Sequence, residues 1–345
     1  MKKVVVGMSG GVDSSVAAYL LKEEGYEVIG LFMKNWEEKD ESGICQSTAD
    51  YEDTLRVCDI LSIPLYTVNF VQEYWDNVFS QFIEELKQGY TPNPDILCNR
   101  EIKFHHFFAK AKSLGANFLA TGHYCRTNEN QLLRGLDPLK DQSYFLYAIS
   151  REILPEVLFP VGNLHKSEVR RIAKQQNLPI HSKKDSTGIC FIGERNFKKF
   201  ISQYIPYHPG NFENLKGEII GHHDGAAYYT LGQRRGLGLG GPGDAWFVVD
   251  KDMKRNVVVI EQGGDHPALY TSELIATEPT FLPKTFPYRC KAKVRYRQED
   301  QECEIVEADE KKIQVHFDKP QRAITPRQSI VFYEGDLCLG GGFIA

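Results

Sequence analysis

The sequence predicts an α/β protein with a doubly wound parallel sheet, followed by a small central domain and a C-terminal β-barrel. Three observations lead to this prediction. The first half alternates short β-branched runs with segments of helical periodicity. Glycine becomes dense after about residue 200. Short strand-like segments then recur from about residue 288, which is typical of a small barrel.

In the first half, strand-like and helical segments alternate. The expected strands are residues 3–6, 26–33, 65–70 and 117–121, and the expected helices are residues 14–24, 48–62, 71–88 and 99–114. In the second helix, Tyr51, Leu55, Cys58 and Leu61 are spaced four, three and three apart, which predicts one buried face. This βα order predicts parallel strands with ligands at their carboxyl ends.

The second half no longer alternates strands with helices. Residues 232–243, GQRRGLGLGGPG, are too rich in glycine for a helix and predict a loop. Hairpin strands are expected at residues 245–250 and 256–261, and barrel strands at residues 288–297, 302–307, 312–317 and 329–333. We therefore expect domains at residues 1–200, 201–267 and 268–345.

Composition excludes several classes of protein. Of 345 residues, 42% are hydrophobic and 25% are charged, ordinary values for a folded globular chain. No apolar run approaches the roughly 18 residues that cross a bilayer, and the N-terminal apolar stretch stops within four residues. We therefore expect a cytoplasmic protein that does not bind membranes. The net charge of −5 disfavours a uniformly basic nucleic-acid binder but permits a local basic patch.

The eight cysteines include no C-x-x-C pair, which disfavours zinc knuckles and common iron–sulfur sites. A disulfide scaffold is not expected without an export signal. Most of the cysteines are therefore expected to be small buried hydrophobic residues.

A loop rich in glycine and serine, GMSGGVDSS, joins the first expected strand to the first expected helix. Two adjacent glycines let backbone N–H groups approach an anion, and the helix N-terminus adds partial positive charge. The loop has neither the lysine of the Walker loop nor the spacing of the dinucleotide-binding glycine motif. Asp13 is a candidate ligand for Mg²⁺ on a pyrophosphate. A tight turn capped by a serine is the structural alternative.

The string SGGVDSS resembles the PP-loop of the ATP pyrophosphatases, which have an adenine nucleotide alpha-hydrolase-like fold. The resemblance implies cleavage of ATP between the α and β phosphates and adenylation of a substrate oxygen. This superfamily includes GMP, NAD and argininosuccinate synthetases as well as tRNA-thiolating enzymes. The loop by itself does not choose among them.

Cys98 follows the segment TPNPDIL, whose two prolines are expected to keep it out of a helix. The cysteine is then expected at or just before a helix start, a position that lowers a thiol pKa. Asn99 is a candidate cap, and Asp95 is a candidate acid or base for the same site. A buried structural cysteine beside a loop aspartate explains these residues equally well.

Cys190 lies in KKDSTGICFIG, with Lys183, Lys184 and Arg195 nearby. These cations favour a thiolate, whereas the flanking Ile and Phe residues favour a buried strand. The pattern alone leaves both interpretations open. A labile cluster that uses Cys98, Cys190 and a third ligand is a further interpretation of these two cysteines.

Five cations alternate along one expected strand: Arg289, Lys291, Lys293, Arg295 and Arg297. Period-two spacing predicts that they share one face, as a phosphate track or as an ordinary solvated face. Tyr296 would then point away from them unless the strand bends or ends. Arg234 and Arg235 are a second candidate patch, and Arg170 and Arg171 are expected on the solvated side of a helix. The pairs His105–His106 and His222–His223 lack a third ligand and are expected to be surface or capping residues.

Several longer motifs resemble the bacterial tRNA-specific 2-thiouridylases along almost the whole chain. They are NPDILCNREIKF, ATGHYCR, KDQSYFL, KDSTGICFIG, LGQRRGLG, VRYR and ITPRQSIVFYEGDLCLGGG. The resemblance implies ATP-dependent transfer of sulfur to C2 of the wobble uridine in tRNAs that read Lys, Glu and Gln codons. It also implies tRNA, a persulfide sulfur donor, ATP and Mg²⁺ as partners and cofactors.

The resemblance also implies roles for individual residues. Cys98 would be the nucleophile, Cys190 would carry the persulfide, and Asp95 is our candidate for proton transfer. The implied ATP-binding residues are Gly7, Met8, Ser9, Gly10, Gly11, Val12, Asp13, Ser14, Met33 and Gly122. The implied tRNA-contacting residues are Asn93, Pro94, Asp95, His123, Lys140, Asp141, Gln142, Arg295, Tyr296 and Gln328.

Two other functions are considered. A PP-loop amidotransferase similar to GMP synthetase would explain the loop but neither the cysteine motifs nor the barrel. An ATP-binding RNA module without turnover would make Cys98 and Cys190 dispensable.

Overall fold

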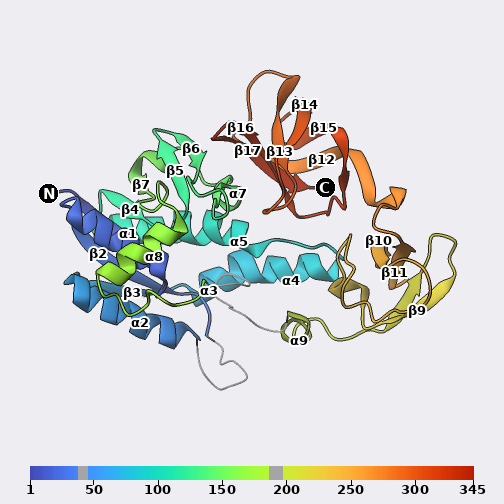
Figure 1. Ribbon diagram of the computed structural model, residues 1–345, viewed down its shortest axis with the longest axis horizontal. Helices are drawn as coiled ribbons and strands as arrows, with labels where there is room; N and C mark the ends of the chain where they lie inside the picture. Colours follow the sequence, from blue (N-terminus) through green and yellow to red (C-terminus); the bar gives the residue numbers. More distant parts are fainter. Residues whose placement is uncertain (38–45, 186–196) are drawn as a thin grey trace. The chain divides into compact units, whose positions relative to one another are not determined.

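The computed structural model describes residues 1–37, 46–185 and 197–345 (Figure 1). The chain divides into two compact units. The N-terminal unit comprises Met1–Phe79, Pro94–Arg195 and Glu334–Leu339, and the C-terminal unit comprises Ser80–Asn93, Asn196–Tyr333 and Gly340–Ala345. Cys190 lies outside the described residues.

In the described part of the N-terminal unit, five parallel strands form a sheet in the order β3–β2–β1–β4–β7. They are β1 (Lys3–Met8), β2 (Glu27–Lys34), β3 (Leu65–Asn69), β4 (Phe118–Ala120) and β7 (Val157–Leu158). Strand β1 pairs in parallel with both β2 and β4, so the predicted doubly wound sheet is confirmed. The chain extends first to one side of β1 and then to the other. The switch point, where such sheets bind ligands, therefore lies at the carboxyl ends of β1 and β4.

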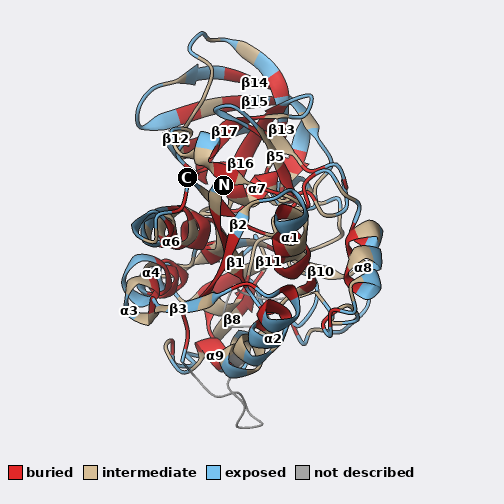
Figure 2. Cartoon of the chain, turned by 90° about the vertical axis from the view of Figure 1, so that its left-hand side faces the viewer, coloured by how far each residue is buried: buried red, intermediate tan, exposed pale blue. Residues whose placement is uncertain are grey.

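Helices α1 (Val12–Glu23), α2 (Gln46–Leu61) and α8 (Lys166–Gln175) belong to the same unit. Val4, Val5 and Val6 of β1 have no exposed surface, and Figure 2 shows this strand among the buried elements. Val16 and Ala17 of α1 pack in the same apolar cluster as β1. A strand that is apolar on both faces is expected where helices cover both faces of a sheet.

The expected buried face of α2 is partly wrong. Cys58 and Leu61 are buried, but Leu55 is 41% exposed. Thr54, directly before Leu55, is fully buried. Because one residue turns a helix by about 100°, a face centred on Thr54, Cys58 and Leu61 leaves Leu55 at its edge.

Two helical stretches contain π-helical turns in place of continuous α-helix. The first is α3 (Val71–Tyr74), η1 (Trp75–Phe79) and α4 (Ser80–Lys87), and the second is α5 (Pro94–Leu97), η2 (Cys98–His106) and α6 (Phe107–Ser113). The second stretch corrects a prediction, because Pro94 lies inside the helix as its first residue. Proline is favoured at this position because its φ already has a helical value and because the N–H group that it lacks would have no hydrogen-bond partner within the helix.

The remaining elements of the N-terminal unit are short. They are β5 (Cys125–Asn128), β6 (Gln131–Arg134), α7 (Ser143–Leu146) and η3 (Leu154–Glu156). Strands β5 and β6 form a hairpin that the sequence pattern did not predict.

In the C-terminal unit, a four-stranded sheet has the order β10–β11–β8–β9 within the described residues. Its strands are β8 (Gly210–Glu213), β9 (Ile219–His223), β10 (Trp246–Asp252) and β11 (Val257–Gln262), and the unit also contains α9 (Phe197–Ile201), η4 (Ala226–Tyr228) and η5 (Pro267–Leu269). The expected hairpin of β10 and β11 is confirmed. The glycine-rich residues 232–243 contain neither helix nor strand, as predicted.

The barrel is also confirmed. Its strands follow the order β12–β15–β14–β13–β16–β17, and a further pairing between β12 and β17 closes it. They are β12 (Tyr270–Thr280), β13 (Tyr288–Lys293), β14 (Gln301–Ala308), β15 (Lys312–Arg322), β16 (Ser329–Glu334) and β17 (Leu337–Ile344). Closure removes the exposed edges that an open sheet would present. Strands β12 and β17 were not among the expected ones.

No helix in the parts of the chain that the structure describes is long and apolar enough to span a membrane. The domain boundaries near residues 200 and 267 stay a prediction.

Candidate active site

The loop between β1 and α1 lies at the switch point of the sheet, and at Gly10 it requires a glycine. Gly10 has φ +69°, and a Cβ there would lie 2.4 Å from the carbonyl oxygen of Asp50. A Cβ on Gly122, just after β4, would lie 2.6 Å from the backbone nitrogen of Ser14. A Cβ on Gly7 would lie 3.1 Å from the Phe107 ring. The backbone therefore approaches its neighbours more closely than other residues allow.

The hydroxyl groups of the loop form hydrogen bonds with other residues of the same loop. The Oγ atoms of Ser9 and Ser14 are 3.1 Å apart, and the hydroxyl of Ser15 donates to the carbonyl of Gly11 over 2.8 Å. Gly11, in extended conformation, is the N-cap of α1 and has no side chain to cap the helix. The first N–H groups of α1 therefore receive no side-chain cap from Gly11, an arrangement suited to an anion.

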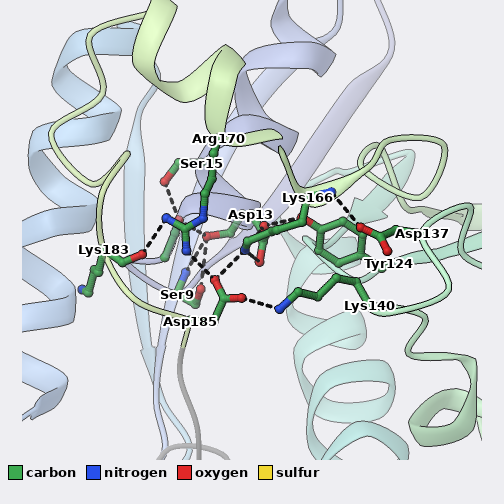
Figure 3. A network of polar contacts seen from close by, with 12 residues as sticks. Ser9, Asp13, Ser15, Tyr124, Asp137, Lys140, Lys166, Arg170, Lys183 and Asp185 are labelled. Carbon is green, nitrogen blue, oxygen red and sulfur yellow. Dashed lines mark hydrogen bonds and ion pairs between the residues drawn. The ribbon is translucent and has the colours of Figure 1, made fainter. Parts of the chain in front are cut away.

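Asp13, in the first turn of α1, binds a lysine from another helix. Both of its carboxylate oxygens accept hydrogen bonds of 2.8 Å from Nζ of Lys166, the first residue of α8 (Figure 3). The hydroxyl of Tyr124 donates to Oδ1 of Asp13 over 2.7 Å. Burial raises the pKa of Tyr124, and the neighbouring Asp13 raises it further. Lys166 is only 9% exposed, so the loop that carries no lysine of its own receives a buried one from α8.

A second carboxylate, Asp185, completes this cluster. It accepts hydrogen bonds or ion pairs from Lys140 at 2.6 Å, Lys166 at 2.7 Å and Arg170 at 2.8 Å. Burial alone would raise the pKa of Asp185, but the hydrogen bonds and charges of Lys140 and Lys166 outweigh it and lower the pKa to about 2. The expectation that Arg170 is on a solvated helix side is wrong, because its guanidinium binds Asp185 and two backbone carbonyls. Arg171 is exposed, as expected.

Lys183 connects the loop to α2. Its Nζ donates to the carbonyl of Gly10 over 3.0 Å, to Asp50 over 2.9 Å and to Asp53 over 2.6 Å. Burial lowers the pKa of Lys183, but its two carboxylate partners reverse this effect and raise the pKa overall. The segment that leads toward Cys190 is therefore anchored on the loop itself.

Residues 137–142 form a compact turn held by its own side chains. Buried Asp137 accepts from the backbone N–H of Lys166 over 2.9 Å. Buried Asp141 accepts from the N–H groups of Gly135 and Ser143, and Gln142 accepts from the N–H of Tyr124. The carboxylate of Asp141 and the amide oxygen of Gln142 therefore stabilise this turn and the adjacent strand β5.

Cys98 does not lie at or before the helix start, which corrects the sequence-based expectation. It follows α5 and opens the π-helical segment η2, and it has no exposed surface. The unsatisfied N–H groups at the positive helix end belong to residues before Cys98, among which Pro94 has none to contribute, so the thiol lies beyond the turn where that charge acts. Asn99 is not a cap either, since it is inside η2 and donates to the carbonyl of Phe145. Asp95 lies in the first turn, three residues before Cys98 and on the same helix face.

Three family models match the chain in succession. They are described as tRNA methyl transferase HUP domain (residues 2–194), tRNA methyl transferase PRC-barrel domain (198–262) and aminomethyltransferase beta-barrel domain (271–344). The tRNA-specific 2-thiouridylase MnmA of Protochlamydia amoebophila is 60% identical over 99% of this chain and 93% of its own length. Its counterpart in Bacillus pumilus is 55% identical over 99% and 94%.

The chain belongs to the tRNA-specific 2-thiouridylase family. The 2-thiouridylases are enzymes, which agrees with the activity class that the motifs predict. These matches extend over 99% of the chain and confirm the family that the motifs alone predicted.

The described residues contain no group of three or more His, Cys, Asp or Glu side chains arranged to hold a metal. His222 is exposed, whereas His223 is not a surface residue: it is buried between Phe212 and Tyr229 and accepts from the N–H of Gly225. Burial lowers its pKa.

The five-cation stripe is interrupted in this 2-thiouridylase. Strand β13 ends at Lys293, so Arg295 and Arg297 lie beyond it, and the chain bends before Tyr296. Within the strand, Arg289 binds Asp318 with two hydrogen bonds of 2.7 Å, and Lys293 lies 3.8 Å from Asp300 with 14% of its side chain exposed. The inward residues Cys290 and Ala292 are buried as predicted.

The other candidate residues are distributed over both units. His123 binds Thr121 over 2.8 Å, and burial, with the charge of Lys103, lowers its pKa well below the usual value. Met33 is buried near the end of β2. Gln328, in the C-terminal unit, donates to the carbonyl of Thr91.

Sequence reasoning missed three of the residues that connect these elements: Tyr124, Lys166 and Asp185. It named Lys183 only as a cation near Cys190, whereas the structure places it on Gly10, Asp50 and Asp53. Tyr124 and Asp185 lie inside motifs that carry the family resemblance, so those motifs were a usable signal. No motif pointed to Lys166, because the residues around it are those of an ordinary helix start.

Proposed function

We propose that this chain transfers sulfur to C2 of the wobble uridine in tRNAs that read Lys, Glu and Gln codons. The reaction would consume ATP and release AMP and pyrophosphate. It would take place in the cytoplasm, with a cysteine desulfurase or a sulfur-relay protein as the persulfide donor.

The observation that carries this proposal is that the nucleotide loop and Cys98 share one packed substructure. The helical stretch from Pro94 to Ser113 includes both Cys98 and Phe107, and the Phe107 ring packs on Gly7 at the loop. The loop that would activate the C2 oxygen and the cysteine that would take part in sulfur transfer therefore lie on elements that pack against each other.

The C2 oxygen of uracil is a poor leaving group, and adenylation converts it into a good one. The oxygen attacks the α-phosphate and pyrophosphate departs, so charge builds on the leaving group and must be met by fixed donors. The candidate donors are the backbone and hydroxyl groups of Gly7–Ser14, with Met33 and Gly122 beside the nucleotide.

Mg²⁺ fits the donor chemistry of the site, because Asp13 provides the carboxylate oxygens that this ion prefers. Asp13 also binds Lys166, so the remaining ligands would be phosphate oxygens and water. Bound there, the ion would neutralise charge on the phosphates. We propose Asp13 as its protein ligand.

Sulfur transfer would follow in two steps. The outer sulfur of a persulfide on Cys190 attacks C2 and AMP leaves, which joins C2 to Cys190 through a disulfide. Cys98 then attacks the Cys190 sulfur, so the transferred sulfur stays on C2 and a Cys98–Cys190 disulfide forms. Asp95 would accept the proton that the attack releases. Because Cys98 is fully buried, substrate binding would have to expose its thiol.

The tRNA would contact residues in both units. Asn93, Pro94 and Asp95 would face the target base. His123, Lys140, Asp141, Gln142, Arg295, Tyr296 and Gln328 would contact the rest of the tRNA.

The test is a reaction of purified protein with ATP, Mg²⁺, a persulfide donor and unmodified tRNA, followed by mass spectrometry of the nucleosides. Wild type should produce 2-thiouridine, and Cys98→Ala and Cys190→Ala should each reduce it at least a hundredfold. Only Cys190→Ala should lose persulfide loading from a labelled donor.

The matched control is Cys58→Ala. Cys58 is a buried thiol of the same unit whose pKa is raised to about 12 by burial and by Asp59, so it cannot act as a thiolate at neutral pH. This variant should thiolate normally. Full thiolation by Cys98→Ala would refute the assignment, and AMP formation without any thiolated product would refute the reaction.

A further inference from the structure

The carboxylate of Asp185 lies among three cations that come from two different parts of the N-terminal unit. Lys166 and Arg170 project from the first turn and the next turn of α8, and Lys140 projects from the turn at residues 137–142 (Figure 3). Each cation lies within 2.6–2.8 Å of an Asp185 oxygen. Three converging donors at such distances are the arrangement by which proteins hold a multiply charged oxyanion.

This cation cluster adjoins the nucleotide loop. Nζ of Lys166 lies 2.7 Å from Asp185 and 2.8 Å from Asp13, so one ammonium connects the cluster to the first turn of α1. The close approach of Gly122 to Ser14 places the chain after β4 beside the same helix start, and the contact of Gly10 with Asp50 places the loop backbone against α2. An anion bound at the N-terminus of α1 would therefore be within reach of the cluster.

Asp185 offsets part of the positive charge of the cluster. With Asp185 in place, three cations meet two carboxylates. If its side chain rotated away, the same three cations would face Asp13 alone, a surplus suited to a pyrophosphate group.

We propose that Lys140, Lys166 and Arg170 bind the β- and γ-phosphates of ATP, and that Asp185 occupies their site until the phosphates displace it. This inference deepens the proposed function and rests on it for the identity of the nucleotide. Lys140, Lys166 and Arg170 thus become phosphate-binding residues, supplied by α8 and the 137–142 turn to a loop that has no lysine. Lys140 is thereby assigned to the nucleotide in place of the tRNA contact that the family resemblance implies.

The exchange requires little movement of the backbone. One guanidinium nitrogen of Arg170 donates to the carbonyls of His181 and Lys183 over 3.0 and 2.9 Å, while the other binds Asp185. Lys183 is itself anchored on Gly10, Asp50 and Asp53. The segment before Asp185 therefore stays in place when only the Asp185 side chain turns, and the second guanidinium nitrogen becomes available to phosphate.

The experiment measures binding of inorganic pyrophosphate and of AMP separately by calorimetry on the full chain. Asp185→Asn removes the competing charge and should tighten pyrophosphate binding about tenfold, the equivalent of one modest ion pair. AMP affinity should stay unchanged. Adding Lys140→Gln to Asp185→Asn should reverse most of the gain, and Lys166→Met alone should weaken pyrophosphate binding at least tenfold.

The control is Asp318→Asn, which removes an arginine-bound carboxylate from the barrel and should alter neither affinity. Circular dichroism would establish that each variant is folded. Unchanged or weaker pyrophosphate binding by Asp185→Asn, or normal binding by Lys166→Met, would overturn the inference. Because these measurements use no tRNA, their failure is distinct from a failure of wild type to thiolate tRNA, which would refute the proposed function alone.

Discussion

At Gly10, a single backbone position combines two requirements that only glycine meets. Its φ of +69° is left-handed, and the nearest obstacle to a Cβ is the backbone of Asp50 at 2.4 Å. A side chain can rotate away from a clash, but the backbone of α2 can move only with the helix. The nucleotide loop is therefore shaped by α2 as well as by its own residues.

Gly10→Ala should weaken ATP binding at least tenfold, because the loop must shift to separate the new Cβ from Asp50. Left-handed strain alone costs about 1–2 kcal/mol. The matched control is Gly25→Ala, which has φ +83° but no atom within 4 Å of the added Cβ. It should lose similar stability yet bind ATP normally. Equal ATP affinity in the two variants, measured by calorimetry, would contradict the steric account.

Among the elements, strand β13 is shorter than the alternating pattern of cations in the sequence predicts. The alternation of cations with buried residues holds from Arg289 to Lys293, where the strand ends. Arg295 is exposed beyond that end, whereas Lys293 is largely covered and lies near Asp300. Exposed cations outside the strand are therefore better candidates for RNA phosphates than those within it.

Arg295→Gln should weaken tRNA binding and reduce its salt dependence, since each lost phosphate contact lowers the log–log slope by roughly 0.7–0.9. Lys293→Gln, the matched control two residues earlier, should leave the slope nearly unchanged. Filter binding over a range of salt concentrations would measure both. A larger slope change for Lys293→Gln would show that the strand face itself contacts RNA.

At the scale of the whole molecule, stability should depend on pH through a partly buried lysine of the C-terminal unit. Lys251 in β10 donates to the carbonyl of Tyr229 over 2.7 Å, and burial lowers its pKa from 10.5 to about 8. Between these values the folded chain has lost the proton that the unfolded chain still binds. The free energy of unfolding should therefore rise with pH across that window.

The rise from Lys251 should reach at most about 3.5 kcal/mol, from roughly 1.4 kcal/mol per pH unit. Lys251→Met has no titrating group here and should lack this contribution. Urea unfolding of both proteins from pH 7.5 to 10.5, followed by tryptophan fluorescence, measures the difference, and groups common to both cancel. Parallel stability curves would mean that Lys251 titrates alike in the folded and unfolded states.

Local patterns in the sequence determined much of this protein. Alternating apolar runs predicted the parallel sheet, since strands buried on both faces need β-branched residues throughout. Glycine density predicted the loop at residues 232–243, and the strings around Gly10 and Cys98 predicted the family. In each case the information is carried by residues close together in the chain.

Only the tertiary structure decided which charged groups meet. Asp13, Lys140, Lys166 and Asp185 are separated by as many as 172 positions, and no periodicity relates them. Their pairing depends on α8 beginning beside the nucleotide loop. The helical position of Pro94 and Cys98 was likewise decided by packing, because proline at a helix start satisfies local rules as well as proline in a loop does. Local sequence constrains backbone conformation, whereas charge pairing depends on distances that the complete fold sets.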